Sequence, residues 1–306
     1  MKTSPAIGRE RLDLLDPAES ARLGGLEVVT EGIVEGFLSG LHRSPRRGFS
    51  VEFAEHRAYQ LGDEPRYVDW KLLARTDRLY VKQYEEETNL RAMLVLDASR
   101  SMAWSGDAAR LTKFAYARLL CAALALVLLR QRDATGLITF DEVVRSLVPP
   151  RARPRHWYQL LAVLQRTQAG KGTAAEPALR RVVAQLRRRG LVVFVSDLLL
   201  DRDLALKALR FLAHRGHQVL VLHLMDPAEQ HLEGAVEARF RDPETGQSVV
   251  LRPQDWVGVY DRTVQDNITA WRGGLRRHGI KYEVITTTTP FGMALRQALV
   301  RATGVA

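Results

Sequence analysis

The chain has 306 residues, enough for one large domain or two modest ones, and its 46% apolar and 26% charged residues are the balance of an ordinary globular protein. The single cysteine, Cys121, excludes a disulfide framework and a metal site built from cysteines, which fits a reducing compartment. The net charge of +10 favours acidic partners, but no recognised nucleic-acid-binding module accompanies the arginines. With no apolar leader at the N-terminus, we expect a soluble, cytoplasmic protein.

The first ninety residues divide into two segments of different character. Residues 9–42 have apolar positions at roughly helical spacing, with a probable break at Gly24-Gly25, so we expect a helical segment over 1–43. Residues 44–90 contain short aromatic-rich stretches, including Phe49–Phe53 and Tyr67–Trp70. The stretch Tyr80–Tyr84 alternates between apolar and polar residues as a strand does. This second segment is therefore predicted to be rich in β-structure.

From residue 91 to 306 strands and helices alternate, which indicates a single α/β domain. The stretches Ala92–Leu96 and Leu191–Val195 are apolar throughout, as expected for strands buried on both faces of a doubly wound, mostly parallel sheet. The run Leu119–Leu129 is too short to span a membrane and is interpreted as a buried helix. A probable β-hairpin at 235–252 departs from this sheet. The other expected strands are 134–140, 143–148, 218–224 and 282–286, and the expected helices are 107–132, 155–166, 175–189, 203–214, 254–278 and 290–302.

A candidate metal site follows the first of these strands. Asp97 comes directly after it, and Ser99 and Ser101 follow at alternate positions, which project to one side of an extended chain. Ligands of such sheets bind beyond the carboxyl ends of the strands. One carboxylate and two hydroxyls are hard oxygen ligands, suited to Mg²⁺, Mn²⁺ or Ca²⁺. The same residues could instead turn the chain and cap a helix, with the carboxylate bonded to backbone amides.

Two further oxygen-bearing residues extend this cluster. The apolar strand 191–195 runs into Ser196-Asp197, so a second carboxylate follows a second buried strand. Thr173 lies in the flexible loop Gly170-Lys-Gly-Thr173 ahead of a helix. The resulting set of one loop threonine, two serines and two aspartates resembles the metal-ion-dependent adhesion site of von Willebrand factor A domains. That resemblance implies that Asp97, Ser99, Ser101 and Thr173 hold the ion directly or through water, and that Asp197 orients a coordinated water. Thr167 is an alternative to Thr173.

The segment before the sheet resembles the hallmark stretch of the DUF58 family, which couples it to a von Willebrand A-like domain. The matching pieces lie at Gly48–Phe53, Arg57–Tyr59, Gly62-Asp63, Arg66, Asp69–Lys71, Ala74–Thr76, Leu79–Lys82 and Glu85–Asn89. The absence of an N-terminal membrane helix implies the soluble branch of that family. Members are often associated with MoxR-type AAA+ ATPases, which implies a role in assembling or activating other proteins.

Charged and aromatic residues of this segment form a candidate partner-binding surface. It consists of Arg57, Asp63, Arg66, Asp69 and Trp70. In the alternative, structural interpretation, the arginines and aspartates pair with one another while the aromatic residues cover an edge of the sheet.

The resemblance implies a metal-dependent protein-interaction module, in which an acidic residue of a partner takes the open position on the ion. We expect no enzyme, because no histidine or lysine has an assignable acid or base role beside the five ligands. Two alternatives stay open: a metal-dependent phosphoesterase that uses the same ion, and nucleic-acid binding through the basic surface.

Overall fold

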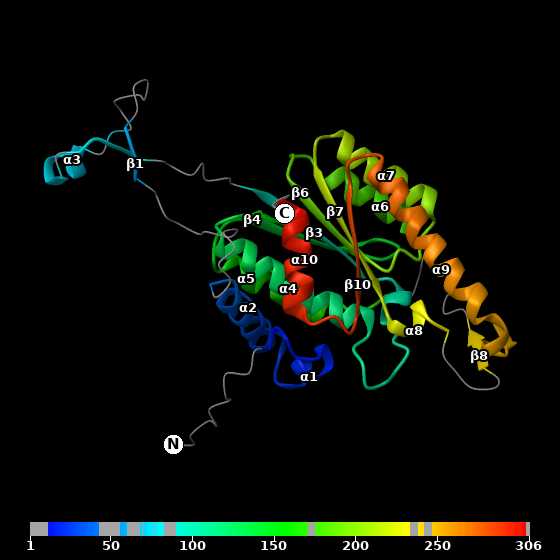
Figure 1. Ribbon diagram of the computed structural model, residues 1–306. Helices are drawn as coiled ribbons and strands as arrows, with labels where there is room; N and C mark the ends of the chain where they lie inside the picture. The colour runs from blue at the N-terminus through cyan, green and yellow to red at the C-terminus, as the bar shows by residue number, and fades with distance from the viewer. Residues whose placement is uncertain are drawn as a thin grey trace, which may run out of the picture. The chain divides into compact units, whose positions relative to one another are not determined.

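The computed structural model describes residues 12–42, 56–59, 68, 70–76, 78–82, 90–170, 175–232, 238–241 and 247–303. The chain forms two compact units, one made of Met1–Arg43 together with Leu90–Ala306 and the other of Ser44–Asn89. The first unit contains the large sheet, and the second contains one short strand pair and a helix (Figure 1).

The first unit is built on a six-stranded sheet with the strand order β10-β7-β6-β3-β4-β5. All neighbouring strands are parallel except β5, which runs antiparallel to β4 at the edge. An edge position tolerates Pro149 and Pro150, which cannot donate to a neighbouring strand. The predicted doubly wound, mostly parallel sheet is confirmed. The strands are β3 (Arg91–Asp97), β4 (Ala134–Phe140), β5 (Val144–Arg151), β6 (Leu191–Ser196), β7 (Gln218–Met225) and β10 (Lys281–Thr286).

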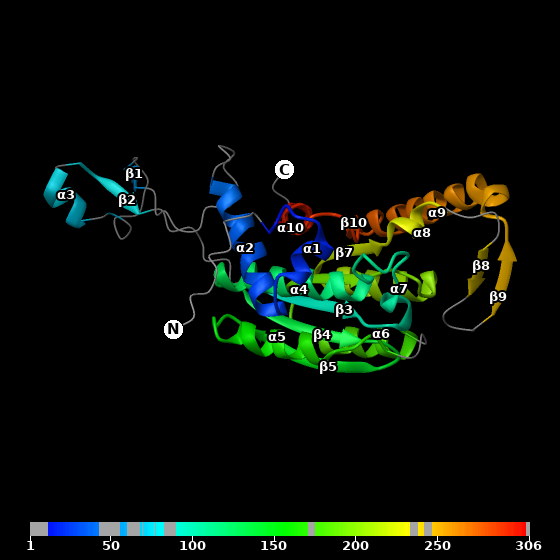
Figure 2. The ribbon, with the colours of Figure 1, turned by 90° about the horizontal axis from the view of Figure 1, so that it is seen from below.

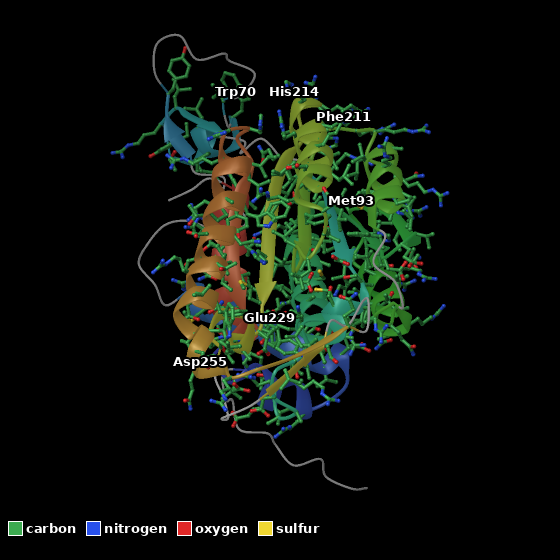
Figure 3. All side chains as sticks on the ribbon, turned by 90° about the vertical axis from the view of Figure 1, so that its right-hand side faces the viewer. Trp70, Met93, Phe211, His214, Glu229 and Asp255 are labelled. Atoms are coloured by element: carbon green, nitrogen blue, oxygen red, sulfur yellow. The ribbon has the colours of Figure 1, made fainter. Side chains whose placement is uncertain are left out.

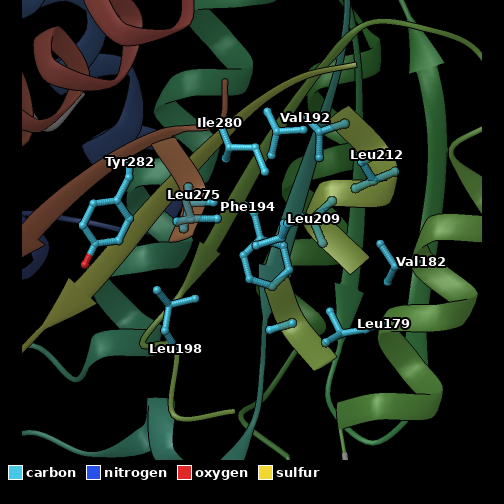
Figure 4. Packing of buried hydrophobic residues seen from close by; sticks show 14 of the residues in the cluster. Leu179, Val182, Val192, Phe194, Leu198, Leu209, Leu212, Leu275, Ile280 and Tyr282 are labelled. Atoms are coloured by element: carbon cyan, nitrogen blue, oxygen red, sulfur yellow. The ribbon is translucent and has the colours of Figure 1, made fainter. Parts of the chain in front are cut away.

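One face of the sheet is covered by α6 (Ala175–Gln185), α7 (Arg202–His214) and α9 (Pro253–Arg276). Their apolar side chains meet those of the central strands, so that Phe194 of β6 lies among Leu179, Leu209 and Leu275 from the three helices (Figure 4). Parallel strands buried on both faces need such a helical layer on each side.

The other face is covered by α4 (Lys113–Arg130) and α10 (Phe291–Thr303), with α5 (His156–Arg166) packed on α4. Nearly every residue of α4 is buried, which confirms the interpretation of Leu119–Leu129 as a buried helix. The helix begins later than the expected Asp107, because Thr112 is its N-cap and its hydroxyl accepts from the Ala115 N–H. In the ranges that the structure describes, no helix combines the length and the apolar content needed to cross a bilayer.

The N-terminal helices α1 (Pro17–Arg22) and α2 (Leu26–His42) belong to this first unit and do not form a separate one. They are divided at Gly24-Gly25, as the sequence predicts. Helix α2 packs on α4 and α10, and the buried Asp13 accepts a hydrogen bond at its main-chain oxygen from the Gly292 N–H at 2.7 Å. The segment therefore completes the helical layer over α4.

The predicted hairpin departs from the main sheet. Strands β8 (Ala238–Arg241) and β9 (Ser248–Leu251) pair antiparallel with each other and form a separate sheet. The pair lies beside the N-terminal end of α9 (Figure 2).

The second unit contains β1 (His56–Ala58) paired antiparallel with β2 (Tyr80–Lys82), and helix α3 (Trp70–Thr76) between them in the chain. The strand over 80–82 was expected, whereas the helix was not, because seven residues carry too little periodicity to identify one. The aromatic-rich stretch Phe49–Phe53 lies outside the described residues.

Candidate metal centre

The structure brings Asp97, Ser99 and Ser101 together at the carboxyl end of β3. The Ser99 N–H donates to the Asp97 carboxylate at 2.8 Å, and the hydroxyls of Ser99 and Ser101 lie 3.1 Å apart. All three residues are buried. The chain stays extended through Ser99, with φ −62° and ψ 165°, and then turns into the short 3-10 helix η2 (Arg100–Ala103). Three oxygen-bearing side chains from one loop therefore converge, as their alternate spacing predicts.

Asp97 carries a carboxylate in an environment that disfavours its charge. Burial raises the pKa of Asp97 to about 7, and the nearby Asp197 carboxylate adds to the rise. Hydrogen bonds from the Ser196 hydroxyl, at 2.6 Å, and from the Ser99 N–H offset part of this shift. Among the described residues, no lysine, arginine or histidine forms an ion pair with Asp97. Without a counter-charge this buried carboxyl group is readily protonated, and a bound cation would favour its ionised form.

These residues fit a hard divalent cation, because they supply carboxyl and hydroxyl oxygens, the donors that such a cation prefers. Within the described ranges, no three or more histidines, cysteines, aspartates or glutamates are grouped so that they could hold a metal. A cation here would thus depend on the hydroxyls of Ser99 and Ser101 as well as on Asp97.

Asp197 lies at the end of β6, as predicted, but its carboxylate is already paired. Its Oδ2 accepts from Lys113 Nζ at 2.8 Å, and its Oδ1 accepts from the Leu199 N–H at 3.2 Å. The same ammonium donates to Glu229 Oε1 at 2.5 Å. Lys113 therefore joins the start of α4 to the end of β6 and to the short helix α8 (Pro227–Gln230). Both carboxylates share one positive charge.

Lys113 lies beside the cluster, a neighbour that the sequence did not reveal. Its side chain is fully buried, and burial by itself lowers its pKa, but the carboxylates of Asp197 and Glu229 raise it above the usual value. The residue stays a charged ammonium. A lysine as the first residue of an otherwise apolar helix, where the macrodipole disfavours a cation, was the available signal.

His223 of β7 is the nearby histidine. Its Nδ1 lies 2.7 Å from the Tyr282 hydroxyl, and burial lowers its pKa to about 4, so the ring is neutral at physiological pH. In the β6–β7 pair, His223 lies opposite Ser196, which is the residue before Asp197. The ring of His223 therefore adds no positive charge to this end of the sheet.

A cleft of about 260 Å³ opens beside the Lys113 ion pairs. The carboxylates of Asp197 and Glu229 reach it, and Leu198, Met225 and Ile268 are part of its apolar wall. Glu229 is held there by a capping box, in which its Oε2 accepts from the Asp226 N–H at 2.9 Å. The cleft gives an incoming group access to this end of the sheet.

The loop that carries Thr173 begins against the metal cluster, although Thr173 itself lies outside the described residues. The Gly170 N–H donates to the Ala98 carbonyl at 2.5 Å, between Asp97 and Ser99 in the chain. The alternative residue, Thr167, ends α5, and its hydroxyl donates to the Val163 carbonyl at 2.8 Å. That hydroxyl is directed back along its own helix.

The five candidate partner-binding residues fall in the second unit and are only partly described. Trp70 begins α3 with 59% of its side chain exposed, and Arg57 lies in β1 opposite Val81. Asp63, Arg66 and Asp69 lie outside the described residues. Their proposed role as one surface stays a prediction.

The fold and the cluster define a doubly wound α/β protein with a candidate cation site beyond the end of its central strand. Residues 55–261, more than half of the chain, match the family model described as "Protein of unknown function DUF58". The chain belongs to this family.

Curated relatives include "Uncharacterized protein Rv1480" of Mycobacterium tuberculosis and "Uncharacterized protein Mb1516" of Mycobacterium bovis. Each is 30% identical over 241 residues, which cover 77% of this chain and 74% of the relative.

Among solved structures, BatB from Bacteroides thetaiotaomicron is similar with a TM-score of 0.47 and 18% identity, over 70% of this chain and 99% of that one. An aerotolerance-related membrane protein from Bacteroides fragilis has a TM-score of 0.45 and 17% identity, over 71% of this chain and 100% of that one.

Proposed function

We propose that this protein is a divalent-cation-dependent protein-interaction module. The observation that carries the proposal is the buried Asp97 carboxylate, which has no ion-pair partner among the described residues and lies beside the converging hydroxyls of Ser99 and Ser101. These three residues would hold the ion, which we expect to be Mg²⁺, with Mn²⁺ and Ca²⁺ as alternatives. Thr173, from the loop that starts against Ala98, would complete the set.

The ion pair of Lys113 with Asp197 favours binding of an acidic group. Because Asp197 already accepts from the Lys113 ammonium, Asp97 is the aspartate of the proposed set that has no ion-pair partner within the described part of the chain. A divalent cation held there keeps excess positive charge, and when bound it supplies an open coordination position that accepts a carboxylate. We therefore propose an Asp or Glu of a partner protein as the ligand.

The family resemblance supports a MoxR-type AAA+ ATPase in the cytoplasm as the partner, with assembly or activation of other proteins as the task. Binding is favoured over catalysis because both neighbouring side chains are already engaged by other residues. Lys113 is a charged ammonium between two carboxylates, and the Nδ1 of His223 is engaged by Tyr282.

Removal of the Asp97 charge tests the cation site. In the wild-type protein, Mg²⁺ at about a hundredfold over its Kd should raise Tm by roughly 5–10 °C relative to the protein in EDTA. Asp97→Asn should abolish this shift, since it removes the charge that the cation balances. The shift should survive in Asp133→Asn, which changes another buried aspartate whose pKa burial raises. Asp133 precedes β4 and so lies at the amino ends of β3 and β4, whereas Asp97 lies at their carboxyl ends. An equal Mg²⁺ response in Asp97→Asn would contradict the proposal.

Partner binding is tested with the MoxR-type ATPase encoded by the same organism. Purified wild-type protein should retain that ATPase on a column in Mg²⁺ and release it in EDTA, and Asp97→Asn should not retain it. Equal retention of the ATPase in Mg²⁺ and in EDTA would show that the interaction does not depend on the cation.

A further inference from the structure

A second surface of the first unit has features of a binding site. A groove of about 320 Å³ runs between α6 and α7 on the side facing away from the sheet. Its apolar lining consists of Leu179, Val183, Leu204, Ala208 and Phe211. Phe211 is 50% exposed, so a large apolar surface of this groove is open to solvent. Phe211 and Glu229, beside the metal cluster, lie toward opposite ends of the molecule in Figure 3.

The groove is bordered by positive charge. Arg180 of α6 and Lys207 of α7 are part of its lining, and the guanidinium of Arg215 lies 5.8 Å from the centre of the Phe211 ring. Further exposed cations on the same two helices are Arg181, Arg202 and Arg210, whereas Asp203 is the exposed acid within the described part of these helices. A ligand of this surface must therefore combine apolar groups with negative charge.

We propose that the α6–α7 groove docks an acidic amphipathic helix of a protein partner. Apolar side chains at i, i+3/i+4 and i+7 of such a helix would enter the groove, and its acidic residues would face Arg180 and Lys207. The ring of Phe211 would be the central anchor, because partly exposed aromatic residues in a concave apolar surface contribute most to binding energy. A nucleic acid also carries negative charge, but four of the five apolar lining residues are aliphatic and offer no surface on which bases stack.

This docking site is separate from the proposed cation site, so its test is done in EDTA. The probe is a fluorescein-labelled peptide of about 18 residues, long enough to form an isolated helix, with leucines at helical spacing and glutamates and alanines elsewhere. Fluorescence anisotropy measures its Kd. A matched peptide carries lysines in place of the glutamates, and a uridine oligonucleotide of similar length serves as the polyanion.

The wild-type protein should bind the acidic peptide at least about tenfold more tightly than the lysine peptide. Phe211→Ala should weaken that binding about tenfold or more, and Lys207→Glu about fivefold, with a smaller salt dependence. The matched controls are Met293→Ala and Arg296→Glu on α10, an exposed apolar and an exposed basic residue on the opposite face of the sheet. Both controls should leave the Kd unchanged.

Three results would overturn the proposal: equal binding of the acidic and lysine peptides, equal effects of the α7 and α10 variants, or tighter binding of the oligonucleotide that Lys207→Glu abolishes. The last result would identify the surface as a nucleic-acid site. Because all four substituted side chains are exposed, circular dichroism should show native folding for each variant. A negative result with the peptide would not bear on the proposed cation site, which is tested separately by the Mg²⁺-induced rise in Tm.

Discussion

Lys113 supplies the positive charge that pairs with two carboxylates at the end of the sheet. It lies 84 residues from Asp197 and 116 from Glu229 in the chain, and its ammonium bonds to both carboxylates. A buried lysine at the start of a helix is unfavourable by itself, so its partners must stabilise it. Because Lys113 is paired with Asp197, Asp97 is the aspartate of the proposed set without an ion-pair partner among the described residues.

Replacement of this lysine should therefore destabilise the fold. Lys113→Met removes the counter-charge of the buried Asp197 and the partly buried Glu229, and the free energy of unfolding in urea should fall by about 3–5 kcal/mol. The exposed Lys207→Met is the control and should change it by no more than about 0.5 kcal/mol. Adding Asp197→Asn to Lys113→Met should recover part of the loss, because the two side chains are coupled. Equal effects of the two lysine variants would mean that the buried pair contributes nothing.

At the scale of the element, the loop after α5 is held against the cluster by a close fit. The Gly170 N–H bonds to the Ala98 carbonyl, and a Cβ at Gly170 would collide with the Asp141 carboxylate. That carboxylate cannot move away freely, because Arg145 donates to it with Nε at 2.8 Å and pairs with it through Nη2 at 2.7 Å. Position 170 therefore has no room for a side chain larger than that of glycine.

A methyl group at this position should disturb the loop. Gly170→Ala should lower the free energy of unfolding by about 1–3 kcal/mol through overpacking, and it should weaken the Mg²⁺-induced rise in Tm. The matched control is Gly258→Ala in α9, where a Cβ meets nothing within 4 Å and helix propensity should raise stability by up to about 1 kcal/mol. A neutral Gly170→Ala would show that the loop adapts without cost.

At the scale of the whole molecule, the large sheet and its two helical layers supply the hydrophobic core. Trp271 of α9 is 1% exposed within the apolar cluster on one face of that sheet. In the second unit, by contrast, Trp70 is 59% exposed at the start of α3. Buried apolar area stabilises the fold, whereas an exposed indole is available to a partner.

The two tryptophans should therefore respond differently to truncation. Trp271→Ala should cost about 3–5 kcal/mol of unfolding free energy, whereas Trp70→Ala should stay within about 0.5 kcal/mol of wild type. Chemical denaturation followed by circular dichroism measures both. A large loss in Trp70→Ala would assign that side chain a structural role and remove it from the candidate partner surface.

The sequence by itself determined the strands of the large sheet, because a strand buried on both faces must be apolar throughout, as Ala92–Leu96 and Leu191–Val195 are. It also determined the convergence of Asp97, Ser99 and Ser101, since alternate side chains on an extended segment point to one side. It did not reveal where α4 starts, because that depends on the Thr112 cap and not on apolar periodicity.

Only the tertiary structure decided what surrounds this cluster. The sheet order places β6 between β3 and β7, and this brings Asp197 near Asp97 and Ser196 beside His223. Lys113 and Glu229 meet Asp197 from helices distant in the chain, and no local spacing encodes such contacts. Burial raises the pKa of Asp97 only once the surrounding elements exclude water, so the raised pKa is a property of the folded molecule.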